Sequence, residues 1–243
     1  MADSNDAMLM SEYRKLIDFC EADANFNPVN PLLPVGAMNA QHATGSNAVT
    51  DIPVKIAPFK VVTNERQQLY DGIAAFGVRI RNMAKASGAS KEMLADMLTY
   101  TRKLRGSRAG EKAVDNPDTP ENEALQSHSV SQTSYVARAE HLRNIVELAK
   151  NEPLYKPNEN DLKTDSIDAY IANLEAKNTE VANKFVPVSN ARALRDQLLY
   201  TNADSIVDVA LQCKAYVAAA LGKNSTLYQQ IKGLKFPRPR RTR

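Results

Sequence analysis

One pattern of apolar residues and prolines occurs twice in this chain, at a constant interval of 129 residues. Two copies of one pattern are expected to adopt one local structure, so the repeat restricts the fold more than the composition does. The repeated positions are Leu16, Phe26, Pro28 and Leu33 in the first copy and Ile145, Tyr155, Pro157 and Leu162 in the second.

The correspondence resumes further along each half. Leu69 and Tyr70 match Leu199 and Tyr200, and beyond them the interval between matched positions is 133 residues. The ordered set of matches predicts an internal duplication. The later matched positions are Ile73, Phe76, Ile80 and Met83 in the first half and Ile206, Val209, Cys213 and Tyr216 in the second.

Apolar residues at helical spacing predict about four helices in each half. The expected fold is therefore all-α, an internally duplicated helical bundle whose two halves are pseudo-two-fold related. In the second half the helices are expected at about 134–151, 162–185, 204–221 and 226–234, with Pro187 bending or ending the second of them. In the first half they are expected at about 9–24, 63–86 and 91–104.

The second helix of the first half is the exception. Gly45, Pro53 and Pro58 interrupt its sequence, and proline removes a helical hydrogen bond and clashes with the preceding turn. We therefore expect this stretch to be broken or loop-like.

Glycine and serine mark the expected helix ends. Gly88 and Gly222 close the third helix of each half, since glycine favours the left-handed conformation of a helix C-terminus. Ser90 and Ser225 are expected to cap the short last helices, and Ser205 resembles the first residue of a capping box.

Polar and small residues dominate the stretch between the halves. The sequence thus divides into a first helical repeat at 1–110, a flexible linker at 111–131, a second helical repeat at 132–236 and a basic Pro/Arg tail at 237–243.

The composition excludes several classes of protein. Residues 1–12 lack the apolar run of a secretory signal, and the most apolar stretch, 206–221, is too short and too polar to span a membrane. Two cysteines in 243 residues are not a disulfide framework. We therefore expect a cytoplasmic protein, with Cys20 and Cys213 as reduced core thiols.

No catalytic, cofactor or metal motif is present in the sequence. His42, His128 and His141 are isolated, and zinc needs three or four clustered ligands. The segment 106–112 has the wrong spacing for a phosphate loop, and 158–165 lacks the central glycine of a calcium loop. We therefore predict no cofactor and no enzymatic activity.

The C-terminal residues form the one candidate binding segment. The chain has a net charge of +3, but the basic residues near the C-terminus leave the remainder mildly acidic. Interleaved prolines keep such a segment extended, and arginines can hold phosphates or acidic groups. The alternative is a disordered solubilising tail. The candidate residues are Lys235, Arg238, Arg240, Arg241 and Arg243.

Several short motifs occur along the chain: Ser131-Gln132-x-Ser134-Tyr135, Tyr155-x-Pro157-Asn158-Glu159-x-x-Leu162-Lys163, Ala176-Lys177-Asn178-Thr179, Leu199-Tyr200 and Tyr228-x-Gln230-x-x-Gly233-Leu234-Lys235-Phe236. These motifs resemble those of an uncharacterised, all-helical protein family of Bacteroidetes-type bacteria. The resemblance covers most of the chain, is strongest in the second half, and implies a bacterial, cytoplasmic, helical protein without assigned catalytic residues.

Three functions follow as hypotheses. The first is a non-enzymatic structural or interaction protein, a helical scaffold that binds a protein partner or assembly. The second is a nucleic-acid or ribosome-associated protein that uses the basic tail, in which deletion of 235–243 abolishes binding and leaves the fold intact. The third is an enzyme with a site between the halves, near Arg66, Tyr70, Arg192 and Tyr200.

Overall fold

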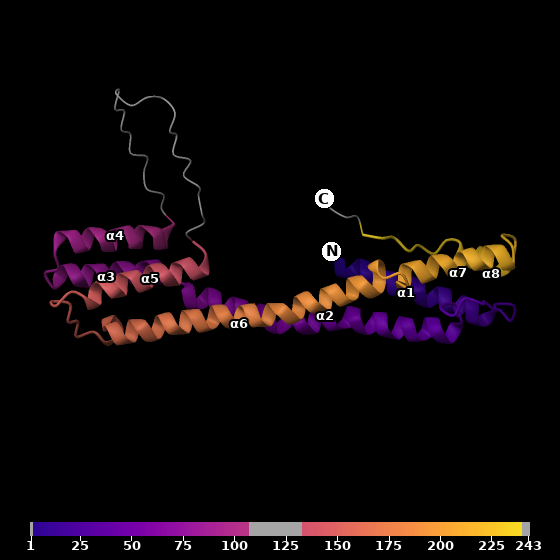
Figure 1. Ribbon diagram of the computed structural model, residues 1–243, viewed down its shortest axis with the longest axis horizontal. Coiled ribbons are helices and arrows are strands. Elements are labelled where there is room, and N and C mark those ends of the chain that lie inside the picture. The colour runs from indigo at the N-terminus through magenta and orange to yellow at the C-terminus, as the bar shows by residue number, and fades with distance from the viewer. Residues whose placement is uncertain (1, 107–132, 240–243) are drawn as a thin grey trace, which may run out of the picture. The chain divides into compact units, whose positions relative to one another are not determined.

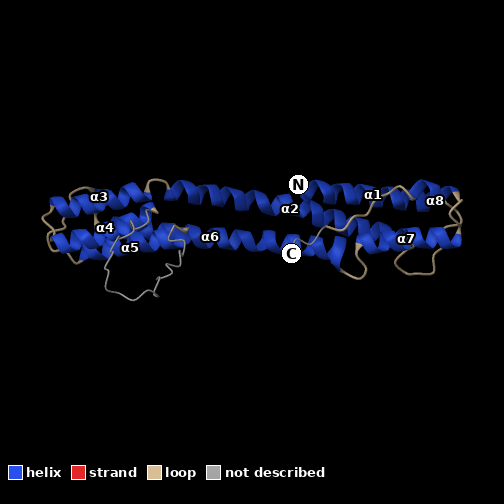
Figure 2. Cartoon of the chain, turned by 90° about the horizontal axis from the view of Figure 1, so that it is seen from above, coloured by secondary structure: helices blue, strands red, loops and turns tan. Residues whose placement is uncertain are grey.

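The computed structural model describes residues 2–106 and 133–239. Every regular element in these ranges is helical, which confirms the all-α prediction for this part of the chain (Figures 1 and 2). The α-helices are α1 (Ala2–Ala22), α2 (Val35–Tyr70), α3 (Ile73–Ala86), α4 (Lys91–Arg105), α5 (Tyr135–Lys150), α6 (Thr164–Asp196), α7 (Ile206–Ala220) and α8 (Thr226–Ile231).

Two shorter elements complete this set. A 3₁₀ turn, η1 (Asn160–Leu162), precedes α6, and a π-helical turn, η2 (Gln197–Thr201), follows it. The predicted linker at 111–131 lies outside the described residues, as do Arg240, Arg241 and Arg243. None of the helices in the described ranges is both long and apolar enough to cross a bilayer.

The chain folds into two compact units, each of which takes elements from both halves of the sequence. Unit 1 comprises Met1–Lys60 and Lys184–Arg243, and so contains α1, the first part of α2, the end of α6, α7 and α8. Unit 2 is the continuous segment Val61–Asn183, with the end of α2, then α3, α4, α5 and the first part of α6.

The core of unit 1 forms where α1 packs against α7 and α8. The buried stripe of α1 contains Leu9, Tyr13, Leu16, Ile17 and Cys20, which recur at the spacing of one helix face. The stripe contacts buried residues of the last two helices, namely Ile206, Val209, Ala210, Cys213 and Val217 of α7 and Leu227 and Ile231 of α8.

The core of unit 2 forms where α5 packs against α3 and α4. The buried stripe of α5 contains Leu142, Ile145, Val146 and Ala149, each 129 residues after a buried residue of α1. This stripe packs with Ile73, Ile80 and Ala84 of α3, Met97 and Leu104 of α4, and Ile167, Ile171 and Leu174 of α6.

The prediction that Gly45, Pro53 and Pro58 break the second helix was wrong. The helix α2 continues through all three residues, with both prolines inside it. Both prolines are exposed, so the carbonyl groups that lose their N–H partners there can bond to water. Gly45 has a different role, because its missing side chain lets α2 approach Ile206 of α7 closely.

Two further boundaries differ from the predicted ones. The helix expected at 63–86 is divided at Gly72, whose positive φ of 76° ends α2 and allows α3 to begin at Ile73. The prediction that Pro187 bends or ends the helix is wrong for the second alternative, because α6 continues through Pro187 to Asp196. Pro187 is exposed, as the two prolines of α2 are.

The predicted caps are present. Gly88 and Gly222 have φ of 90° and 86°, the left-handed conformation that follows a helix end. The hydroxyl groups of Ser90 and Ser225 accept hydrogen bonds from the backbone N–H groups three residues later. Ser205 does the same at the start of α7.

Candidate functional site

The first residues of the predicted basic segment are anchored to the body of unit 1. The ammonium group of Lys214 donates hydrogen bonds of 3.0 Å to the carbonyl oxygens of both Lys232 and Leu234. Phe236 is only 8% exposed and belongs to the core. Deletion from residue 235 would thus remove a core side chain, and the prediction that this deletion leaves the fold intact stays untested.

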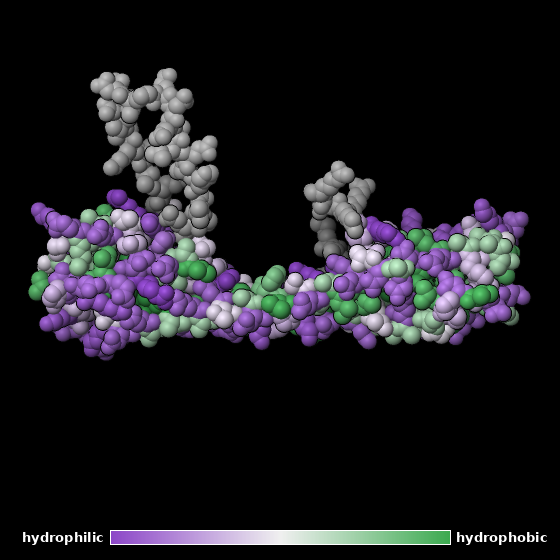
Figure 3. Space-filling view, in the orientation of Figure 1, coloured by the Kyte–Doolittle hydropathy of each residue, from purple (hydrophilic) through white to green (hydrophobic). Residues whose placement is uncertain are grey.

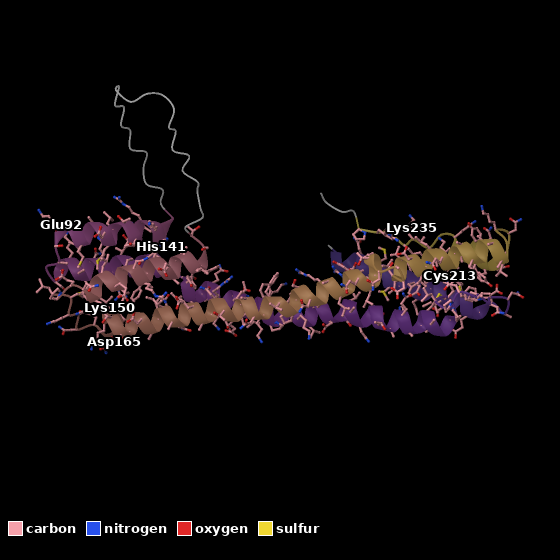
Figure 4. All side chains as sticks on the ribbon, viewed as in Figure 1. Glu92, His141, Lys150, Asp165, Cys213 and Lys235 are labelled. Atoms are coloured by element: carbon pink, nitrogen blue, oxygen red, sulfur yellow. The ribbon has the colours of Figure 1, made fainter. Side chains whose placement is uncertain are left out.

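The two predicted binding residues that the structure describes, Arg238 and Lys235, differ in whether they form an ion pair. Arg238 forms an ion pair with Asp208 of α7, so its charge is already partly neutralised. Lys235 is exposed, and it makes no ion pair among the described residues (Figure 4). Of the predicted binding residues that the structure describes, Lys235 is therefore the more available cation.

Lys235 lines an open groove in unit 1 with a volume of about 1090 Å³. The groove lies between the start of α1, the end of α6 with η2, and the C-terminal segment that ends in Pro237, Arg238 and Pro239. Its wall also carries Asp6, Arg195 and Tyr200, which interact with one another.

A buried ion pair joins α1 to α6 at this groove. The guanidinium group of Arg195 donates a 2.8 Å hydrogen bond to Asp6, and the two residues are 9% and 4% exposed. Arg195 also donates bonds of 2.9 and 2.7 Å to Asp196. The hydroxyl of Tyr200 donates to the second oxygen of Asp6, so both oxygens of this carboxylate are engaged.

The pKa values of Tyr200 and Arg195 are both raised above their ordinary values. Burial raises the pKa of Tyr200, and its hydrogen bond to Asp6 raises it further. Burial opposes the charge of Arg195, but the bonds to Asp196 and the nearby Asp6 carboxylate outweigh it and raise the arginine's pKa. Tyr200 thus stays a neutral donor at physiological pH, which suits it to hold Asp6 and not to act as a base.

A second arginine–tyrosine cluster lies in unit 2. The guanidinium carbon of Arg66 lies 4.0 Å from the ring centre of Tyr135, and the ring of Tyr70 meets that of Tyr135 edge-on at 4.8 Å. Asn178 donates a 2.8 Å bond to the hydroxyl of Tyr70, and Arg138 donates to its carbonyl oxygen at the end of α2. These contacts therefore hold the C-terminal end of α2 against the first residues of α5.

The four residues expected around a site between the halves are distributed between the units. Arg66 and Tyr70 belong to unit 2, whereas Arg192 and Tyr200 belong to unit 1. Arg192 is exposed, and the buried arginine beside Tyr200 is Arg195. Arg195 lies 129 residues after Arg66, so the interval of the repeat was the signal that could have identified it.

The two cysteines are close together in the core of unit 1. Cys20 of α1 and Cys213 of α7 have their sulfur atoms 3.5 Å apart, and both are free and buried. Cys213 is labelled on α7 in Figure 4. The hydrogen bond between the two thiols and their burial raise the pKa of Cys20. The prediction of reduced core thiols agrees with this geometry, but the contact between them was not anticipated.

The two histidines that the structure describes belong to no group of clustered metal ligands. His42 lies near the ring of Tyr13, and His141 lies near that of Tyr100 and has both ring nitrogens buried. His128 lies outside the described residues. Across residues 2–106 and 133–239, no three His, Cys, Asp or Glu side chains gather as a metal ion would require.

A second depression in unit 1 lies between α2 and α6, and we call it the α2/α6 groove. Its volume is about 370 Å³, and Thr44, Asn47, Ala48 and Asp51 line it from α2, with Ala191, Leu194 and Leu198 opposite. The residues of α2 recur at three- and four-residue spacing, so they form one helix face.

Apolar side chains stay exposed on the helix segments that form this groove. Leu194 is 51% exposed, and Val54, Phe185 and Val186 are exposed as well. The rings of Phe59 and Phe185 contact each other at 5.5 Å, which shows that the two segments lie side by side. Hydrophobic residues are visible on the surface over α2 and α6 in Figure 3.

Comparison with known proteins gave no match: no protein-family model, no curated protein and no solved structure is similar to this chain. The resemblance to a bacterial family thus remains a prediction.

Proposed function

We propose that the protein is a non-enzymatic structural or interaction protein, a helical scaffold that binds a protein partner or assembly. The observation that carries this proposal is the α2/α6 groove of unit 1, where the side chain of Leu194 is 51% exposed beside the small residues Ala48 and Ala191. Exposed apolar surface in a groove is typical of interaction sites. A groove between two helices is also a common receptor for a third helix.

We further infer that the scaffold arose by duplication of one helical unit, with the two copies related by a pseudo-two-fold axis. The loops after α1 and α5 support this. The N–H of Phe26 donates to the carbonyl of Asp23, and the N–H of Tyr155 donates to that of Glu152, both at 3.0 Å. The N–H of Leu33 likewise donates to the carbonyl of Asn30, and the N–H of Leu162 donates to that of Glu159, both at 3.0 Å.

The arginine–tyrosine clusters support the same inference. Arg66 and Arg195 are 129 residues apart, and so are Tyr135 and Asp6, their respective partners on α5 and α1. In this interpretation both copies keep the arginine, but its partner differs between them. Arg66 makes a cation–π contact with Tyr135, and Arg195 makes an ion pair with Asp6.

The second candidate is a nucleic-acid or ribosome-associated protein. The observation that favours it is Lys235, which is exposed on the groove at the C-terminal segment. Phosphate contacts release counterions, so such binding weakens steeply as salt rises. Because Phe236 is buried, this candidate is tested by Lys235→Glu together with a deletion that begins at residue 240 and keeps the anchored residues 232–239.

Affinity purification of the full chain tests both candidates. We expect a protein partner that resists nuclease, is kept after deletion of 240–243, and is lost from Leu194→Ser. The matched control is Leu211→Ser on α7, since Leu211 is 48% exposed against 51% for Leu194. A nuclease-sensitive set of bound proteins that needs residues 240–243 would instead favour the second candidate.

The bacterial and cytoplasmic assignment is also part of this proposal. It rests on the sequence motifs, several of which have structural roles here. Leu162 accepts the hydrogen bond of the Tyr155 hydroxyl through its carbonyl, and Asn178 bonds to Tyr70. Purification from a bacterial cytosolic fraction with an antibody against the full chain would test the assignment.

A further inference from the structure

We propose that unit 1 contains a redox switch, in which hydrogen peroxide oxidises Cys20 and Cys213 to a disulfide that fastens α1 to α7. The proposal goes beyond the proposed function and does not depend on the α2/α6 groove. It rests on the distance between the two sulfur atoms, on the position of Cys20 in its helix, and on the division of unit 1 into two segments of the chain.

The two sulfur atoms are already in contact. They lie 3.5 Å apart, and a disulfide bond is about 2.05 Å long, so they must approach each other by about 1.5 Å. Rotation of both side chains about their Cα–Cβ bonds can share this movement. The chain has two cysteines, so these two thiols have no alternative partner within it.

The position of Cys20 gives an oxidant a route to the pair. Cys20 lies in the last turn of α1, which ends at Ala22, whereas Cys213 is the central residue of α7. A terminal turn opens more readily than the middle of a packed helix. The hydrogen bond to Cys213 and burial raise the pKa of Cys20 while the turn is closed, so oxidation is slow and proceeds through the open turn.

The reaction converts two thiols and one peroxide into one disulfide and two waters. First, the Cys20 thiolate attacks a peroxide oxygen and the O–O bond breaks, which leaves a sulfenic acid and releases the first water. The turn then closes, and the sulfur of Cys213 attacks the sulfenic sulfur. The S–O bond breaks, and its hydroxyl group leaves as the second water with the proton of Cys213. The two cysteines lose two electrons in total, and the peroxide gains them.

The bond changes how unit 1 is held together. Unit 1 is formed by Met1–Lys60 and Lys184–Arg243, and the core in which α1 meets α7 is built from apolar side chains. The disulfide would join two positions that are 193 residues apart in the sequence. A cross-link that closes a long loop restricts the unfolded chain strongly, so oxidation stabilises unit 1.

The test compares the full chain, folded and unfolded in guanidinium, during exposure to hydrogen peroxide. Samples are quenched in denaturant with iodoacetamide, and their intact mass is measured. A protease site inserted between Asp118 and Thr119 is then cleaved in denaturant, which places the two cysteines on different fragments. Cys20→Ala and Cys213→Ala are the matched controls, since each keeps one thiol and cannot form a bond within the chain.

We expect the folded chain to lose about 2 Da without dimerising, and its cleaved fragments to stay joined until a reductant is added. Neither single variant should give this product. The oxidised chain should unfold at a temperature at least about 5 °C higher than the reduced chain, and a reductant should remove the difference.

Three results would overturn the proposal. The first is a folded chain that keeps both free thiols through an exposure far longer than the one that oxidises the unfolded chain. The second is a mass gain of about 32 or 48 Da, which marks a sulfinic or sulfonic acid, or a disulfide-linked dimer in place of the bond within the chain. The third is an oxidised chain that unfolds at the same or a lower temperature, because the bond would then not fasten α1 in its native position.

Discussion

Cys20 and Cys213 are separated by 193 residues along the chain, yet their sulfur atoms lie 3.5 Å apart. The contact joins α1 to α7 at the centre of unit 1, where both side chains are fully enclosed by apolar neighbours. It thus connects the first helix of one half of the sequence to the third helix of the other half.

Both thiols should be unreactive in the folded protein. Reaction requires the thiolate, and the raised pKa of Cys20 keeps this thiol protonated, while burial excludes the reagent from both sulfurs. With Ellman's reagent at about pH 8 we expect slow labelling of the native chain and fast labelling of two thiols after unfolding in guanidinium. Two fast thiols in the native protein would contradict the packing of α1 on α7.

The ion pair between Asp6 and Arg195 should contribute measurably to the stability of unit 1. Asp6→Asn leaves a buried guanidinium with Asp196 as its remaining carboxylate partner among the described residues, and should lower the free energy of unfolding by about 2 kcal/mol. Urea denaturation would measure it. The control is Asp18→Asn, which removes an exposed carboxylate paired with the half-buried Arg14, with an expected loss below about 0.5 kcal/mol.

Stability should fall at alkaline pH because of buried tyrosines. Burial raises the pKa of Tyr155 to about 12, and it raises the pKa values of Tyr13 and Tyr200 as well. An unfolded tyrosine ionises near pH 10. The unfolded chain therefore loses protons first, so stability is complete below about pH 10 and falls as pH rises toward 12.

Tyr155→Phe isolates one part of that pH dependence. The variant should lose less stability between about pH 10 and pH 12 than the wild type, although it also loses the hydroxyl bond to the carbonyl of Leu162. Absorbance of the native protein at alkaline pH should show the buried tyrosines ionising later than the exposed ones. Ionisation of all nine tyrosines together near pH 10 would refute this account.

Gly45 should be intolerant of a side chain. A β-carbon there would overlap Ile206 Cδ1 and lie 3.1 Å from Met10 Cε, so these side chains would have to move. We expect Gly45→Ala to cost about 1 to 2 kcal/mol in thermal or urea unfolding. Gly36→Ala is the control in the same helix: nothing lies within 4 Å of its β-carbon, and it should be neutral or stabilising by about 0.5 kcal/mol.

Each unit contains segments from both halves of the sequence, and this predicts how a chain cleaved between the halves behaves. Cleavage at a protease site inserted between Asp118 and Thr119 would break the covalent link between the two halves. Because each unit contains helices from both halves, the fragments should elute together on a native sizing column and separate only in denaturant. Fragments that separate without denaturant would contradict this division of the chain.

The sequence predicted those parts of the fold that depend on local signals. The apolar spacing of α1, α5 and α7 and the caps at Ser90, Ser225, Gly88 and Gly222 follow from short-range rules, and the structure agrees with them. The continuity of α2 was not predictable in this way. Its prolines are tolerated because they face solvent and the helix is held by packing elsewhere along its length.

The candidate sites depended on contacts that local signals do not reveal. Lys235 and Arg238 were identified by charge alone, but the ion pair of Arg238 with Asp208 needs the C-terminal segment to return along α7. The α2/α6 groove likewise joins residues more than a hundred positions apart. The 129-residue interval of the repeat is a long-range signal, because adding it to the position of Arg66 identifies Arg195.

The division of unit 1 into two separate segments has a consequence for the order in which the chain is made. Unit 2 is continuous and can fold once Asn183 has left the ribosome. The helix α1 is synthesised first, but its apolar stripe with Leu16 and Ile17 stays uncovered until α7 and α8 have emerged. Newly made chains therefore expose this stripe during that interval, and exposed apolar surface of this kind favours aggregation of a chain that lacks α7.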